Sequence, residues 1–259
     1  MAEQIHQRAR IGADTITPDD PRYADLASRG SKRFAGTPDY VRLVSSTDQV
    51  VAAVQDAVRE QRRVAVRSGG HCLEGFVADS AVRVVIDMSL MTDIYYDPTM
   101  GAFAIEAGAR LGDAYRKLFL GWGVTIPAGV SPNVGGHVLG GGFGFLCRLH
   151  GLAADHLYGV EVVVVDATGT ARCVVATREA SESQPRLVVG AHRRWRRQLR
   201  DRHPVLVSVT TYHRGCACRT AATRTGIRAD VQRCVELARY GRASLHPAGA
   251  QLRRVVRAQ

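Results

Sequence analysis

Six glycines fall within the ten consecutive positions from Gly135 to Gly144. A backbone without side chains can approach another backbone or a flat ligand closely, and it can adopt positive φ angles. A turn needs only one or two glycines, so a run this dense predicts a backbone threaded beside an extended group. A tight β-bend explains the same run equally well if the run is considered alone.

A second glycine pair follows a short apolar segment. The β-branched run 64–66 leads directly into Arg67-Ser68-Gly69-Gly70-His71. Glycines after a strand let backbone N–H groups face a pyrophosphate, although a strand followed by two glycines is more often a simple turn. Neither glycine segment fits the G-x-G-x-x-G dinucleotide fingerprint or the G-x-x-x-x-G-K-[ST] phosphate loop. Rossmann and P-loop folds are therefore set aside.

Local patterns alternate between helix and strand up to the glycine run. Residues 46–49 resemble a capping box, and apolar side chains at helical spacing then predict a helix over 47–61. Residues 111–122 have the same spacing. Strands are predicted at 64–66, 82–87 and 102–107, and a hairpin at 160–175. This mixture favours an α+β fold over a doubly wound sheet.

Positive charge is concentrated in the last third of the chain. The net charge is +11, but residues 184–259 hold 17 Arg, no Lys and 3 acidic residues, which leaves residues 1–183 slightly acidic. Apolar periodicity also stops near Ser183, so we expect no packed core beyond it. The predicted organisation is an N-terminal extension over 1–34, a folded domain over 35–183 and a basic segment of low order over 184–259.

Composition excludes several classes of protein. The apolar fraction of 46% is enough for a hydrophobic core. No segment approaches the length of an apolar membrane span, and the N-terminus lacks the apolar stretch of a signal peptide, so we predict a cytoplasmic protein without a membrane partner. The six cysteines show no paired CxxC spacing, which predicts free thiols and no metal site.

Five ordered motifs resemble the berberine-bridge-enzyme-like FAD-linked oxidases of the vanillyl-alcohol-oxidase superfamily. Within that family the chain looks most similar to bacterial antibiotic-tailoring enzymes of the glycopeptide hexose oxidase kind. The motifs are 67–71, 86–89, 127–137, 140–144 and 151–155, and the resemblance covers about residues 35 to 183. It implies that the folded domain is a PCMH-type FAD-binding domain built from two α+β subdomains.

The resemblance implies that FAD contacts both glycine segments. The pyrophosphate would lie on residues 67–70, and the isoalloxazine would lie against the run 135–144. The implied cofactor-binding residues are Arg67, Ser68, Gly69, Gly70, His71, Cys72, Ser131, Val134, Gly135, Gly136, Gly140, Gly141, Gly142, Gly144 and Val160.

His71 matches the histidine that this family bonds covalently to the methyl group of the flavin's benzenoid ring. Such a bond withdraws electron density and raises the redox potential of the flavin, which favours hydride transfer from an unactivated alcohol. Many members form a second bond from a cysteine within Gly-Val-Cys-Pro, but Ser131 stands at that position here. A hydroxyl cannot form the thioether, so we expect a single covalent link.

The resemblance also implies the reaction partners. They are a small-molecule alcohol or sugar-bearing substrate and O2, in secondary metabolism. Cys72 and Cys147 lie near the glycine segments but away from the motif cysteine, and we expect them to be small buried apolar residues. His137 and His150 are assigned no role, and the catalytic residues are unknown.

Residues 184–206 depart from the family pattern. In the family, this stretch contains Asp-Leu-Trp-Trp, and five glycines follow soon afterwards. If Arg193, Arg194, Arg196 and Arg197 use CGG codons, reading from the second base of each codon yields glycines at these places. We therefore hypothesise a frameshift near residues 183 and 184, and sequencing the DNA tests it. In that case residues 184–259 hold no counterpart of the family's substrate domain or its catalytic tyrosine.

Two alternatives to an active oxidase stay open. The first is an inert truncated FAD-binding remnant. The second is a basic nucleic-acid-binding module that uses the arginine-rich segment 193–202. No recognition fold or aromatic interleaving accompanies that charge, so we expect no nucleic-acid partner.

Overall fold

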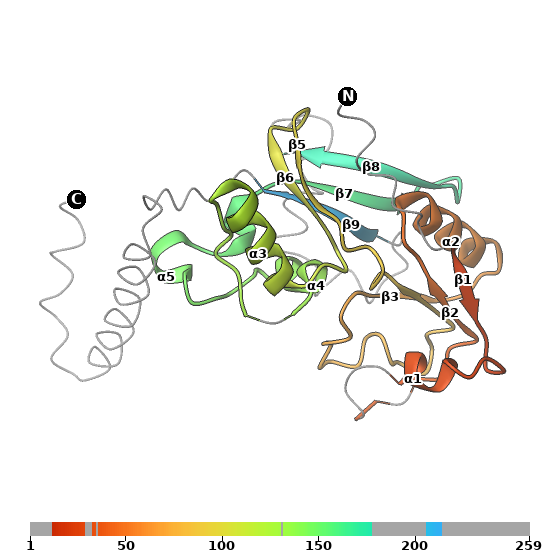
Figure 1. Cartoon of the computed structure of the whole chain (residues 1–259). Coiled ribbons are helices and arrows are strands. Elements are labelled where there is room, and N and C mark those ends of the chain that lie inside the picture. Colours follow the sequence, from red (N-terminus) through yellow and green to blue (C-terminus); the bar gives the residue numbers. More distant parts are fainter. Residues whose placement is uncertain (1–11, 29–32, 35, 131, 178–205, 214–259) are drawn as a thin grey trace, which may run out of the picture.

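The computed structural model describes residues 12–28, 33–34, 36–130, 132–177 and 206–213 (Figure 1). Two β-sheets with helices packed on them make up this part of the chain, which confirms the α+β class. The arginine-rich segment 193–202, the predicted frame change near 183 and Ser131 lie outside the described residues.

The first sheet is mainly parallel and has the order β1-β2-β4-β3. Its strands are β1 (Asp14–Ile16), β2 (Tyr40–Leu43), β3 (Val64–Arg67) and β4 (Val84–Asp87). β2, β4 and β3 run parallel, while β1 pairs antiparallel with β2 at one edge. The short helix α1 (Tyr23–Ala27) follows β1. Because β3 and β4 are parallel and in register, Arg67 and Asp87 lie side by side at their carboxyl ends.

The second sheet is antiparallel and has the order β5-β6-β9-β7-β8. Its strands are β5 (Ile94–Asp97), β6 (Ala102–Glu106), β7 (Leu157–Val165), β8 (Ala171–Thr177) and β9 (Leu206–His213). The predicted hairpin is confirmed as β7 and β8, which pair antiparallel around a turn at Gly169 with φ +81°.

β9 lies beyond Ser183, where we expected no packed core. It forms the middle strand of the second sheet, between β6 and β7, and residues 210–213 are buried. The run Leu206–His213 is rich in β-branched and aromatic residues, which suits a pleated and buried position. The arginine-rich composition around it hid this pattern.

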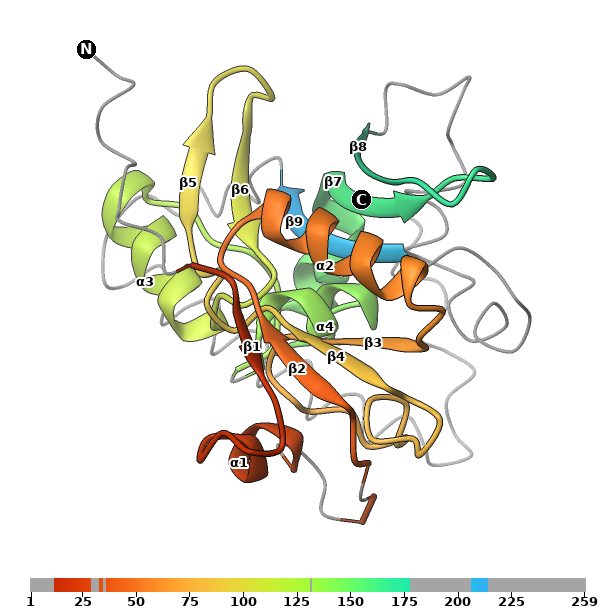
Figure 2. The ribbon, with the colours of Figure 1, turned by 90° about the vertical axis from the view of Figure 1, so that its right-hand side faces the viewer.

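Helix α2 (Thr47–Arg59) packs against both sheets (Figure 2). The predicted cap is present, since the Ser46 side chain accepts the N–H of Gln49 at 3.3 Å and the Gln49 side chain accepts the N–H of Ser45 at 2.7 Å. Its apolar face shares one core cluster with residues of both sheets: Val50, Val54, Ala57, Val84, Ile86, Val163 and Ala171. α2 therefore joins the two sheets into one core.

Two further helices pack against the antiparallel sheet and share one core cluster with its strands β5, β6, β7 and β8. Helix α3 (Leu111–Trp122) has the predicted bounds and ends at Gly123, which adopts φ +66°. The start of the glycine run is helical, as α4 (Val134–Leu139), and is not the β-bend considered from the sequence. Helix α5 (Cys147–His150) and the 3-10 helix η1 (Ala153–His156) follow it.

Candidate cofactor site

The two glycine segments lie against each other. A Cβ added to Gly69 would lie 2.1 Å from Oδ1 of Asn133, the residue that precedes α4. The nearest atom to a Cβ added to Gly136 is Oγ of Ser68, at 4.0 Å. The Asn133 amide donates to the carbonyl of Gly108 at 2.6 Å, which fixes its orientation. The loop after β3 and the start of α4 therefore form one surface, as the sequence predicted.

The loop after β3 presents unused backbone donors. The N–H groups of residues 68–71 donate no hydrogen bond to any residue in the described part of the chain. Gly70 adopts φ +74°, a conformation that glycine reaches without strain. Successive free N–H groups in such a turn make a concavity that binds anions. This loop fits a pyrophosphate.

Arg67 is buried beside that loop instead of facing it. Its guanidinium pairs with the Asp87 carboxylate, with Nη2 and Nε at 2.7 Å and 2.8 Å from Oδ2. Asp87 also accepts the N–H of Ser89 at 2.9 Å. The side chain of Arg67 therefore anchors the end of β3 to β4, and in this arrangement it holds the loop in place.

The glycines of the second run divide into two groups. Gly135, Gly142 and Gly144 are buried because their neighbours leave no room for a side chain. A Cβ on Gly144 would lie 1.9 Å from the carbonyl oxygen of Ala128, and one on Gly142 would lie 2.5 Å from Cβ of Ala153. Gly136, Gly140 and Gly141 are at least partly exposed, so only these three offer close approach to a ligand.

The other predicted site residues take different positions. His71 is exposed, and its ring lies beside Gly69, whose added Cβ would be 2.8 Å from Cδ2 of the imidazole. Cys72 is half-buried. Val134 and Val160 are almost completely buried in one core cluster, beneath the surface that the glycine segments form.

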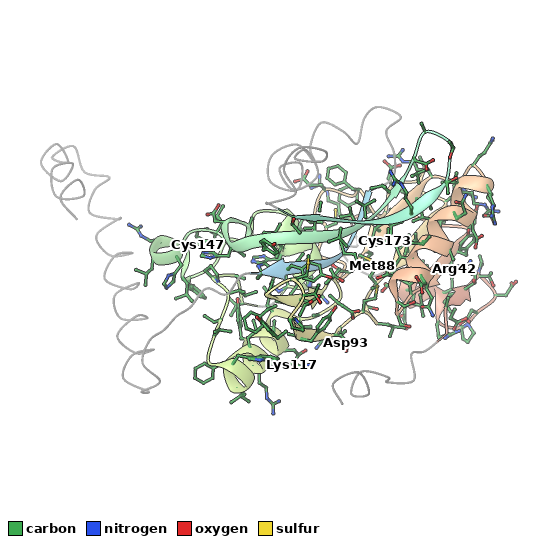
Figure 3. The ribbon with its side chains drawn as sticks, turned by 90° about the horizontal axis from the view of Figure 1, so that it is seen from above. Arg42, Met88, Asp93, Lys117, Cys147 and Cys173 are labelled. Carbon is green, nitrogen blue, oxygen red and sulfur yellow. The ribbon has the colours of Figure 1, made fainter. Side chains whose placement is uncertain are left out.

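Cys147 lies on α5, at the opposite end of the molecule from Arg42 on β2 (Figure 3). Its sulfur accepts the N–H of Gly144 at 2.8 Å. Cys147 is only half-buried, and its sulfur also accepts a hydrogen bond. It therefore does more than fill space as the small buried apolar residue that we expected.

Two residues that contact Gly129 had no role assigned from the sequence. Nε2 of His137 accepts the N–H of Gly129 at 2.8 Å, and the Tyr115 hydroxyl donates to the carbonyl of Gly129 at 2.5 Å. Burial lowers the pKa of His137 and raises the pKa of Tyr115 to about 12. His137 lies within a recognised motif, but only the fold shows what it contacts.

Two further findings concern metal-binding groups and membrane-spanning helices. No three His, Cys, Asp or Glu residues of the described segments gather as a metal-binding group. None of the helices in those segments is long and apolar enough to cross a membrane.

Comparison with known families shows which family this domain belongs to. A family model described as an FAD binding domain matches residues 38–173, just over half of the chain. The chain belongs to the FAD-binding domain family. FAD is therefore the cofactor expected of this domain.

Relatives of this FAD-binding domain include named oxidases. The aclacinomycin-N/aclacinomycin-A oxidase of Streptomyces galilaeus is 60% identical over 177 residues, which are 67% of this chain and 32% of the relative. The hexose oxidase of Chondrus crispus is 38% identical over 60% of this chain and 29% of its own length. The chain thus spans about a third of the length of these relatives.

Solved structures agree with this assignment. A glycopeptide hexose oxidase in complex with teicoplanin superposes with a TM-score of 0.71 and 48% identity, over 78% of this chain and 40% of that one. An aclacinomycin oxidoreductase gives a TM-score of 0.71 and 50% identity, over 79% of this chain and 41% of that one. The PCMH-type fold implied by the motifs is confirmed at the level of the FAD-binding domain.

Proposed function

We propose that this FAD-binding domain serves an oxidase of secondary metabolism that oxidises a hydroxyl-bearing carbon of a sugar or another small alcohol. The observation that carries the proposal is the loop 68–71, which lies beside the start of α4 and whose N–H groups donate to none of the described residues. The names of the relatives, hexose oxidase and aclacinomycin oxidase, support the substrate class and the use of O2.

The roles of this chain's residues follow from their positions. The N–H groups of 68–71 bind the pyrophosphate, and the Arg67–Asp87 pair keeps their strand end in place. Gly136, Gly140 and Gly141 leave room for the flat ring system. Bound FAD would supply two-electron redox chemistry: a hydride from the alcohol carbon would reduce it, and O2 would reoxidise it with release of hydrogen peroxide. The base that takes the hydroxyl proton is not assigned.

We further propose that His71 carries the flavin covalently and that Ser131 leaves it as the only link. His71 is exposed on the loop that meets α4, which leaves its imidazole accessible to a bound cofactor. Attachment to an imidazole raises the potential of the flavin and so favours hydride transfer.

The flavin spectrum of the purified protein tests this proposal. The protein is expected to be yellow, and the colour should stay with the polypeptide after acid precipitation. His71→Ala should release all flavin on precipitation, while Cys72→Ser should retain it. Protein that stays colourless after supplementation with FAD would refute cofactor binding. A panel of sugars and alcohols tested for peroxide release then separates an active oxidase from an inert FAD-binding remnant.

A further inference from the structure

We propose that His137 and Tyr115 are positioning residues that hold the backbone N–H and C=O of Gly129, so that α4 fixes the segment 127–130 relative to the loop 68–71. The proposal concerns contacts within the protein. Only the consequence for FAD binding rests on the proposed function. The segment 127–130 precedes Ser131, the position at which many family members form a second flavin bond.

Gly129 is buried and belongs to no helix or strand. Its backbone N–H and C=O belong to two successive peptide groups. Each of these buried polar groups needs a partner, and both partners here are side chains. His137 accepts the N–H at 2.8 Å and Tyr115 donates to the C=O at 2.5 Å. The conformation of this segment therefore depends on two side chains instead of a backbone ladder.

Packing reinforces the two hydrogen bonds. A Cβ on Gly129 would lie 2.9 Å from Cε1 of His137 and 3.0 Å from the carbonyl oxygen of Phe143. The preceding carbonyl, that of Ala128, presses against Gly144. Val130, one residue later, is 66% exposed. The clamp that His137 and Tyr115 form on Gly129 therefore acts at the last buried residue before the chain reaches the surface.

The hydrogen bond fixes the tautomer of His137. Because Nε2 accepts, the ring proton must lie on Nδ1, and an imidazolium could not accept at all. Burial favours the neutral ring that the contact requires.

Helix α4 connects this clamp to the loop 68–71. Asn133, at its start, contacts Gly69, while His137, one turn later, holds Gly129. The position of the segment 127–130 relative to the loop 68–71 thus depends on a single short helix. A change at His137 should displace the segment 127–130 and leave the loop 68–71 in place.

The test uses the full chain and two variants of nearly equal size. The oxygen of His137→Gln can take the place of Nε2, whereas His137→Leu fills space but cannot accept. By NMR, we expect His137→Leu to speed hydrogen exchange of the Gly129 amide about tenfold, the effect of losing one net hydrogen bond. His137→Gln should restore slow exchange, and the ¹⁵N shifts of wild-type His137 should show a protonated Nδ1.

Tyr115→Phe provides a second measurement if His137→Leu does not fold. It removes only the hydroxyl, and exchange at Gly129 should again quicken. Tyr96→Phe, which removes an exposed hydroxyl from β5, is the matched control and should change nothing. Unchanged exchange at Gly129 in both His137→Leu and Tyr115→Phe, or a proton on Nε2, would overturn the clamp. Absence of flavin from the wild type would instead refute the proposed function and leave the exchange result intact.

Discussion

At the scale of single residues, the pair formed by Arg67 and Asp87 anchors the strand end that precedes the loop 68–71. The side chains are only 2% and 0% exposed. Removing one partner of such a pair leaves an uncompensated buried charge, which typically costs about 3–5 kcal/mol. Asp87→Asn is therefore expected to lower the free energy of unfolding by about 3 kcal/mol in urea titrations. Asp20→Asn, which breaks an exposed pair with Arg22, is the control and should have a far smaller effect.

The buried side chain of His213 should make the stability of the protein depend on pH. It is completely buried on β9, Nε2 lies 3.2 Å from the Thr211 hydroxyl, and Nδ1 has no partner among the described residues. Burial, with a smaller contribution from His156, lowers its pKa from 6.5 to about 4. The unfolded state therefore binds more protons in this range, and stability falls as the pH drops from about 6.5 to about 4.

The size of that fall follows from the shift in pKa. It is on the order of 3 kcal/mol at most, because each unit of pKa corresponds to about 1.4 kcal/mol. His213→Leu cannot titrate, so its free energy of unfolding should change less over this pH range. Equal slopes for the wild type and His213→Leu in urea titrations at several pH values would contradict the prediction.

At the scale of elements, local signals account for the parts predicted correctly. α2 and α3 have a cap or a terminal glycine and a clear apolar period, and the bounds of α3 match the prediction. α4 could not be predicted in this way because its glycines disfavour a helix. The carbonyl of Ala107 accepts the N–H of Gly135 at 3.0 Å. This contact stabilises a helix that the local sequence does not favour.

The candidate site was predictable in its location but not in its internal contacts. Motif order placed both glycine segments together, and the fold confirms that they meet. Which glycines face inward, and why Arg67 turns away from the loop, depends on neighbours far along the chain such as Ala153 and Asp87. Spacing alone carries no information about such contacts.

Gly144, in the loop after α4, and Gly112, in α3, should respond oppositely to alanine. Gly144→Ala forces a methyl group into the backbone of Ala128 and should destabilise the protein by more than 1 kcal/mol. Gly112, in α3, has no atom within 4 Å of an added Cβ, so Gly112→Ala should stabilise the protein by up to about 1 kcal/mol. Thermal unfolding of both variants measures the difference, and a stabilised Gly144→Ala variant would show that the close packing is not real.

At the scale of the whole molecule, β9 holds the antiparallel sheet together. It pairs with β6 on one side and β7 on the other, so proline within it would break a ladder in the middle of the sheet. Thr211→Pro is expected to abolish cooperative unfolding seen by circular dichroism. Thr211→Val, which keeps the branched shape and loses the hydroxyl contacts with Ile105 and His213, should cost about 2 kcal/mol and leave a cooperative transition.

The position of β9 also sets an order of events during synthesis. The β5–β6 and β7–β8 hairpins are each local in sequence, but the strand between them comes later, and Thr211 meets Ile105 across 106 positions. Until His213 has left the ribosome, the inner edges of both hairpins present unpaired backbone groups, which are sites of edge-to-edge aggregation. The yield of folded protein therefore depends on protecting these edges until β9 has been synthesised.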